Sequence, residues 1–179
     1  MTGPAIFGKL PAHGDFVARG LAPEMRDALD NWLSGSIADA REALREGYED
    51  AFDSAPPWRF VLPQGAGWIA GALAPSVDGV GRRYPILAQV PIAALGSGGN
   101  GAAHCEAAIY GAIEHGQDVD ALHLALSQPV AEWDDDWPGR PGWWSMGSKV
   151  HALAGERPTG LIRAMLTLSE HDVETERAE

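Results

Sequence analysis

Residues 75–85, Pro-Ser-Val-Asp-Gly-Val-Gly-Arg-Arg-Tyr-Pro, constrain the fold most strongly, because they place a turn-rich segment between two apolar runs. The two runs, residues 67–74 and 84–92, are predicted to be strands. Consecutive strands joined by short loops pair in the antiparallel sense. The segment therefore predicts an antiparallel sheet, with two adjacent arginines in a loop of a protein whose formal net charge is -12.

The rest of the chain supplies further strands and helices. Apolar residues from Met25 to Leu44 recur at spacings of three and four, which predicts an amphipathic helix that ends near Glu46. Gly35 weakens the middle of this helix, so a kink is an option there. Other predicted strands cover residues 5–10, 14–18, 58–62 and 150–154, and other predicted helices cover residues 102–114, 119–127 and 161–168. The predicted fold class is α/β (α+β): a single domain, residues 1–169, with a mostly antiparallel sheet flanked by helices.

Three segments are predicted to lie outside regular structure. Residues 95–101 contain Gly-Ser-Gly-Gly-Asn-Gly and are predicted to be a flexible break between blocks of secondary structure. Residues 132–138 are an acidic and aromatic loop, whose aspartates are expected to be solvated and not to form a cation site. Residues 170–179 are rich in acids and are expected to be a disordered tail.

Composition argues against several classes of function. The net charge of -12 disfavours nonspecific nucleic-acid binding, which needs a basic surface, and docking on an anionic membrane. The single cysteine, Cys105, excludes an intramolecular disulfide and is expected to be a buried thiol. The absence of an apolar leader or span predicts a cytoplasmic protein without membrane insertion. No metal-ligand spacing or nucleophile motif is present, so no metal, no other cofactor and no catalytic residue is expected.

Four charged residues are candidates for a partner-binding or structural motif: Asp15, Asp78, Arg82 and Arg83. Adjacent side chains of an extended segment point to opposite faces, so one arginine is expected to pair internally and the other to face outward. Asp15 and Asp78 are the expected internal partners. Because arginine recognises carboxylates and phosphates through paired hydrogen bonds, the outward arginine is either structural or a contact for a partner or phosphate. Asp15 is either a turn residue or an ion-pair partner.

Trp143 and Trp144 are the remaining candidates. Two adjacent large rings cannot face the same side of a strand. One is expected to fill the core, and the other to be half-exposed or covered by the acidic loop. An exposed tryptophan is a common interface anchor.

Several segments together resemble the TagF family, also called ImpM, of accessory proteins of bacterial type VI secretion systems. The first is Phe-Gly-Lys-Leu-Pro-Ala-His-Gly-Asp-Phe-Val at residues 7–17, followed by Trp-Leu at residues 32–33 and Ala-Pro-Pro-Trp-Arg-Phe at residues 55–60. Residues 75–85 and Gly-Trp-Trp-Ser-Met-Gly at residues 142–147 complete the set. Residues 95–140 do not contribute to the resemblance, and no phosphatase domain, to which some relatives are fused, accompanies the module.

The resemblance implies a cytoplasmic regulator and not an enzyme. TagF-like proteins repress assembly or firing of the secretion apparatus after translation, within a threonine-phosphorylation pathway, and some engage a forkhead-associated scaffold protein. The implied fold is a compact α/β domain similar to longin or profilin-like domains. The family offers no catalytic residues, so Asp15, Asp78, Arg82 and Arg83 are interpreted as an ion-pair cluster. The alternative is a small-molecule or nucleotide-sensing module that uses the Arg82/Arg83 loop.

Overall fold

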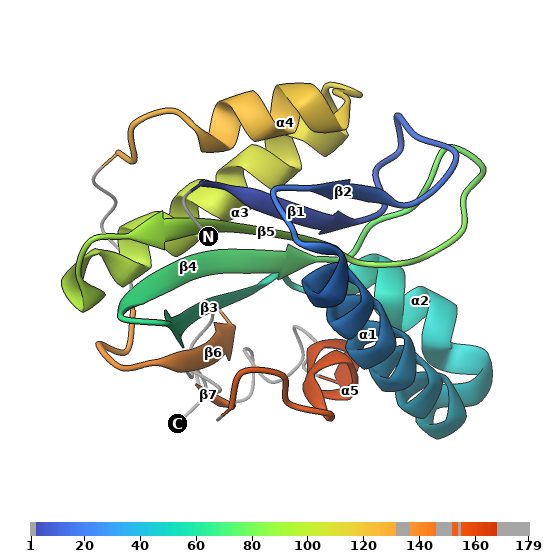
Figure 1. Cartoon of the computed structure of the whole chain (residues 1–179). Coiled ribbons are helices and arrows are strands. Elements are labelled where there is room, and N and C mark those ends of the chain that lie inside the picture. Colours follow the sequence, from blue (N-terminus) through green and yellow to red (C-terminus); the bar gives the residue numbers. More distant parts are fainter. Residues whose placement is uncertain (1–2, 132–136, 146–151, 154, 168–179) are drawn as a thin grey trace, which may run out of the picture.

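An antiparallel sheet of seven strands lies between two layers of helices in the computed structural model (Figure 1), which describes residues 3–131, 137–145, 152–153 and 155–167. The strand order across the sheet is β2-β1-β5-β4-β3-β6-β7. The strands are β1 (Ala5–Gly8), β2 (Val17–Arg19), β3 (Trp58–Gln64), β4 (Gly67–Ala74), β5 (Ile86–Ile92), β6 (Gly142–Ser145) and β7 (Ala152–Leu153). Every pairing between neighbouring strands is antiparallel, so the predicted single α+β domain is confirmed.

The helices divide between the two faces of the sheet. One layer holds α1 (Pro23–Leu44), α2 (Tyr48–Ser54) and α5 (Leu161–Thr167), with the 3-10 turn η1 (Arg45–Gly47) between the first two. The other layer holds α3 (Gly98–Glu114) and α4 (Val119–Leu126), preceded by the 3-10 turn η2 (Leu95–Ser97). The helices expected at residues 102–114, 119–127 and 161–168 are present, and α1 runs unbroken through Gly35.

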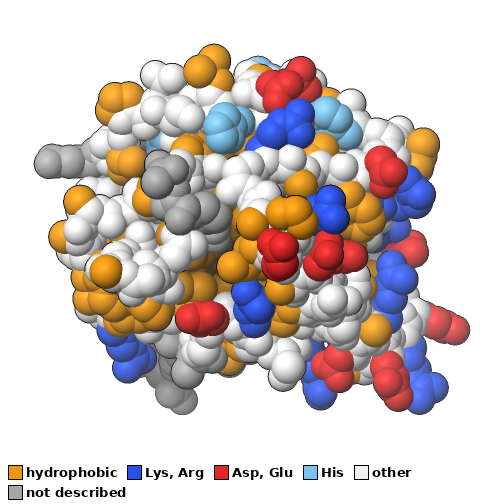
Figure 2. Space-filling model, in the orientation of Figure 1, with side chains coloured by type: hydrophobic (Ala, Val, Ile, Leu, Met, Phe, Trp, Pro, Cys, Tyr) orange, Lys and Arg blue, Asp and Glu red, His pale blue; other side chains and the backbone are white. Residues whose placement is uncertain are grey.

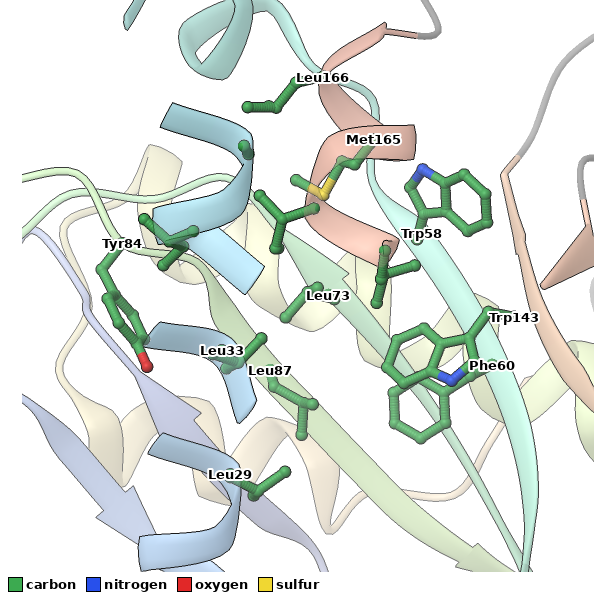
Figure 3. Close-up of a cluster of buried hydrophobic side chains, with 14 of the residues drawn as sticks. Leu29, Leu33, Trp58, Phe60, Leu73, Tyr84, Leu87, Trp143, Met165 and Leu166 are labelled. Atoms are coloured by element: carbon green, nitrogen blue, oxygen red, sulfur yellow. The ribbon is translucent and has the colours of Figure 1, made fainter. Parts of the chain in front are cut away.

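Side chains of β4 show why the two layers differ. Successive residues of a strand point to opposite faces. Ile69 and Leu73 belong to the core under α1, whereas Ala70 and Ala72 face α3. The α1 face carries most of the buried aromatic side chains, among them Trp58, Phe60 and Trp143 (Figure 3), whereas β4 presents alanines to α3.

The glycine-rich stretch at residues 95–101 is not a flexible break, so that prediction is wrong. Its last four residues begin α3, and Gly98, Gly99 and Gly101 are buried. A Cβ added to Gly101 would lie 2.8 Å from Ala70 Cβ and 2.9 Å from Ile92 Cγ2. The glycines thus let the backbone of α3 approach the sheet more closely than a side chain would allow.

The two adjacent tryptophans face opposite sides of the sheet, as expected, but both are buried, with exposures of 1% for Trp143 and 0% for Trp144. Trp143 packs in the α1 layer, against the Phe60 ring at 4.3 Å between centroids. Trp144 packs with Val61 and Ala102, and the half-buried Trp137 lies against the same cluster. The half-exposed alternative is therefore wrong. Trp137, a described residue of the acidic loop, lies against the cluster that holds Trp144, as the alternative of cover by that loop predicts.

Two other expectations fall on residues outside the described part of the chain. The aspartate run of the acidic loop, residues 134–136, lies outside the described residues, and so does the expected tail at residues 170–179. In the part that is described, no helix is both long and apolar enough to cross a membrane.

Candidate functional site

The two signature loops, residues 9–16 between β1 and β2 and residues 75–85 between β4 and β5, lie side by side at one end of the sheet (Figure 1). The Gly79 N–H donates to the His13 carbonyl oxygen at 2.6 Å. A Cβ at Gly79 would lie 3.1 Å from the Pro11 carbonyl oxygen and 3.3 Å from that of His13. The absence of a side chain at residue 79 therefore allows the two loop backbones to touch.

Asp78 is the centre of this contact, with a side-chain exposure of 0%. Its Oδ2 accepts from Lys9 Nζ at 2.8 Å and from Arg82 Nε at 2.6 Å. Its Oδ1 accepts from the backbone N–H groups of Val80 at 3.1 Å and Arg82 at 2.9 Å. Burial alone would raise the pKa of Asp78, but the hydrogen bonds from Lys9, Arg82 and Val80 hold it well below the ordinary value of 3.8. Asp78 is therefore ionised at neutral pH and joins the two loops.

The side chains of Arg82 and Arg83 contact different parts of the protein. Arg82 pairs with Asp78, one of its two expected partners, and its Nη2 donates to the Gly14 carbonyl oxygen at 2.7 Å. The expectation that the other arginine faces outward is wrong. Arg83 Nε and Nη2 donate to the Asp53 carboxylate of α2 at 2.8 and 2.7 Å. Helix α2 was not predicted from the sequence, and this contact ties it to the signature loop.

Charge strengthens the contact between Arg83 and α2. Glu49 Oε2 lies 3.0 Å from Arg83 Nη1, so the guanidinium meets two carboxylates. Hydrogen bonding to Arg83 lowers the pKa of Asp53. Hydrogen bonding to Asp53 in turn raises the pKa of the Arg83 guanidinium. Each of the three guanidinium nitrogens of Arg83 thus contacts a carboxylate of α2, and the pair with Asp53 has the bidentate geometry that arginine adopts with carboxylates.

Asp15 lies in the turn and outside the ion-pair cluster. Its Oδ1 accepts from the backbone N–H of Phe16 at 2.8 Å, and its side chain is exposed. Within the described part of the chain Asp15 forms no ion pair. The turn-residue alternative accounts for it, and the Gly14 carbonyl occupies the position of the second acceptor for Arg82.

Neighbouring helices fix the outer sides of the two loops. His13 Nε2 accepts the N–H of Val119, the first residue of α4, at 3.0 Å. Tyr84 Oη donates to Asp30 Oδ1 on α1 at 3.2 Å. The loops are thus held by α1, α2 and α4 as well as by Asp78, which makes them a rigid pair.

The tip of this pair exposes apolar surface. Phe16 is 45% exposed and Val80 is 72% exposed. The Phe16 ring stands edge-on to Tyr84 at 4.7 Å between centroids, and Lys9 Nζ lies 5.1 Å from its centre. The Arg82 side chain is 59% exposed beside them. We call the exposed side chains of Phe16, Val80 and Arg82 the loop-tip surface.

Sequence reasoning missed several residues of this site. Lys9 and Phe16 stand in the quoted motif at residues 7–17, but only Asp15 was singled out there. A lysine in a segment of otherwise buried residues is a signal that it must have a partner, since lysine is almost never fully buried unless paired. No local signal marks Asp53, because its partner lies 30 residues away.

The described residues contain neither a metal-ligand cluster nor an exposed thiol. No group of three His, Cys, Asp or Glu among them is placed to hold a metal ion. Cys105 is fully buried, and burial raises the pKa of its thiol. The chemistry that the arrangement does support is recognition: a rigid loop pair that presents two apolar side chains and one guanidinium.

Comparisons with known proteins identify the family of this chain and a solved structure with the same fold. The family of the TagF N-terminal domain, described as type VI secretion system-associated, matches residues 5–129. The chain therefore belongs to this family, and the match extends into the region after residue 95 that the motifs did not reach. The crystal structure of PA0076 from Pseudomonas aeruginosa PAO1 shares the fold, with a TM-score of 0.61 at 24% identity over 95% of this chain and 78% of the other. Among curated proteins, none matches the sequence significantly.

Proposed function

We propose that this chain is a cytoplasmic, non-enzymatic regulator that represses type VI secretion after translation by binding another protein of the system through the loop-tip surface. Family membership supports the link to type VI secretion. The main observation behind this proposal is that the buried Asp78 holds both signature loops together, while the tips of the loops expose Phe16 and Val80. A rigid, partly apolar patch binds at low entropic cost, which suits recognition of a protein.

The charges at the loop-tip surface indicate which chemical groups the partner's surface should carry. The cluster of Lys9, Asp78 and Arg82 carries one more positive than negative charge, and the positive charge reaches solvent at Arg82. The rest of the chain is acidic, with a net charge of -12. The partner surface is therefore expected to combine an apolar pocket with a carboxylate or phosphate, and a forkhead-associated scaffold protein of the secretion system is the first candidate.

The alternative of a nucleotide sensor built on the two arginines gains no support from this geometry. Arg83 is engaged by Asp53 and Glu49, and Arg82 by Asp78 and the Gly14 carbonyl. A phosphate held by both guanidiniums would have to displace the two carboxylates from Arg83, which leaves only the exposed part of Arg82 for an ionic contact. Because these charged side chains already pair with one another, they are engaged in holding the fold, which supports the proposal that the chain is not an enzyme.

The test is capture of purified type VI secretion components by the immobilised chain, with Val80→Glu as the disrupting variant and Leu124→Glu as the matched control. Leu124 lies on α4 and is 64% exposed, close to the 72% of Val80, so both changes add one charge at an open position. Val80→Glu is expected to weaken capture at least about tenfold. Equal capture by both variants, each with a wild-type unfolding midpoint, would contradict the proposed surface.

A further inference from the structure

A cavity of about 210 Å³ lies on the α1 face of the sheet, beneath the first half of α1 and beside the β3–β4 turn. Its inner walls are mostly apolar and aromatic, and Figure 3 shows Leu29, Leu87, Phe60 and Trp143 among the buried side chains of this face. Apolar side chains also gather on the surface at the left end of the sheet (Figure 2). The β3–β4 turn and the signature loops lie at opposite ends of β4, so this cavity is separate from the loop-tip surface.

Indole hydrogen bonds hold the aromatic walls in place. Trp32 Nε1 donates to the Pro158 carbonyl oxygen at 3.1 Å, and Trp143 Nε1 donates to the Glu156 carbonyl oxygen at 3.2 Å. The two rings lie 5.5 Å apart between centroids. Residues 155–160, the segment that leads into α5, therefore form one side of the cavity and fix both indoles. These two hydrogen bonds hold the aromatic walls in place without a ligand.

One wall residue is polar although it is buried. Gln89 on β5 lines the cavity and is 6% exposed. A primary amide has two N–H donors and a carbonyl oxygen with two lone pairs, so it can serve more than one partner. Gln64, Glu156 and Arg157 also line the cavity but are partly or fully exposed, so Gln89 is its one buried polar wall residue.

Size limits what the cavity can take. An engineered apolar cavity of about 150 Å³ binds benzene. The present cavity is larger, at about 210 Å³, which leaves room for one substituted ring or a fused pair of rings. It is below the ~300 Å³ at which sites for drug-sized ligands begin.

We propose that this cavity binds a single aromatic group that carries a hydrogen-bonding atom, an indole or a phenol, with the ring between the aromatic and aliphatic walls and the polar atom toward Gln89. Stacking against Phe60, Trp32 and Trp143 favours a ring over an alkyl chain. The group can come from a free small molecule or from a tryptophan or tyrosine side chain of a partner. The site goes beyond the proposed function and does not depend on it.

The experiment is a titration of the full chain with indole, followed in ¹H–¹⁵N correlation spectra. Saturable shifts are expected for the indole N–H signals of Trp32 and Trp143 and for the Gln89 side-chain amide. The indole N–H of Trp144, on the opposite face of the sheet, serves as the internal reference and is expected to stay in place. The absence of saturable shifts at the solubility limit of indole would overturn the proposal.

Two variants at the cavity rim make the test specific. Met25 is half-buried, and Arg157 Nη2 contacts its sulfur at 3.1 Å. Met25→Trp places a ring in the cavity, whereas Met25→Leu removes the same sulfur contact and leaves the space open. Met25→Trp is expected to weaken indole binding at least about tenfold relative to Met25→Leu. Equal binding by the two folded variants would overturn the proposal.

Further ligands test the role of Gln89 and show whether the bound ring belongs to a small molecule or to a partner protein. Phenol is expected to bind more tightly than toluene to the wild type, and Gln89→Leu is expected to abolish that preference. Equal binding of phenol and toluene by the wild type would contradict the role of Gln89.

N-acetyltryptophanamide distinguishes the two sources of the ring. Binding comparable to that of indole supports a partner's side chain, and binding of free indole alone supports a small molecule.

Discussion

Replacement of Gly101 by alanine is expected to destabilise the protein, although alanine is the better helix former. In a helix interior, alanine is favoured over glycine by about 0.5–1 kcal/mol. At Gly101 the new Cβ would lie 2.8 Å from Ala70 Cβ and 2.9 Å from Ile92 Cγ2. Carbon atoms pack favourably at about 3.5–4.0 Å, so α3 and the sheet must separate by about 0.7 Å or more.

The magnitude follows from these two opposing effects. Forced overpacking of a core costs about 1–3 kcal/mol, which exceeds the gain in helix propensity over most of that range. Gly111 provides the matched control, because it lies in the same helix and a Cβ there would meet nothing within 4 Å. Gly111→Ala is expected to stabilise the fold by about 0.5–1 kcal/mol. The two variants should therefore differ in free energy of unfolding by about 1–3 kcal/mol.

Urea denaturation at equilibrium measures this difference, and thermal unfolding supplies a second estimate. For a chain of this size each kcal/mol corresponds to about 2–4 °C in Tm. If Gly101→Ala and Gly111→Ala stabilise the protein equally, close approach of α3 to the sheet is not the reason for glycine at residue 101. That result would refute the account given for the glycine-rich stretch.

Three further changes test the core and the signature loops. Gly71→Ala should cost more than Gly101→Ala, about 3 kcal/mol or more in urea unfolding, because its Cβ would collide with the Ala88 carbonyl oxygen and the Phe60 ring. Asp78→Asn should lower the free energy of unfolding at neutral pH, since a carboxylate with a lowered pKa contributes stability above its unfolded value of 3.8. That contribution is lost as pH falls through the lowered pKa, so the gap between wild type and variant should narrow towards about pH 3, and a gap independent of pH would contradict the assignment. Asp53→Asn should cost only a small fraction of the Asp78→Asn loss in the same assay, because its carboxylate is 53% exposed and solvent screens the pair.

Much of the sheet could be predicted from the sequence, because its strands are short apolar runs bounded by turn residues. The run at residues 67–74 coincides with β4, and the opposite orientations of Trp143 and Trp144 follow from the geometry of a strand. The N-terminal part of α3 could not be predicted in this way. Glycine disfavours helix, and only the tight packing of the helix on the alanines of β4 overrides that preference.

Helix α2 and the pairing in the site depend on contacts that are distant in sequence. Tyr48 and Phe52 are the buried residues of α2, and with Ala51 they have helical spacing, but a seven-residue segment is too short for that spacing to identify a helix. Its link to the loop is the ion pair of Asp53 with Arg83. The pair of Lys9 with Asp78 spans 69 residues, and no local pattern selects Lys9 over another cation. Local sequence showed which residues were candidates, and only the fold shows which of them meet.

Structural and contact roles coincide at Arg82 but separate at Val80. The Arg82 guanidinium bonds the buried Asp78 while more than half of the side chain is exposed, so its replacement disturbs the loops and the surface together. Val80 contributes only its backbone N–H to Asp78, and its side chain is 72% exposed. A substitution at Val80 keeps that N–H and changes only what the tip presents. Binding data at residue 80 therefore decide whether the loop pair meets a partner, whereas stability data at residues 78 and 82 decide how it is held.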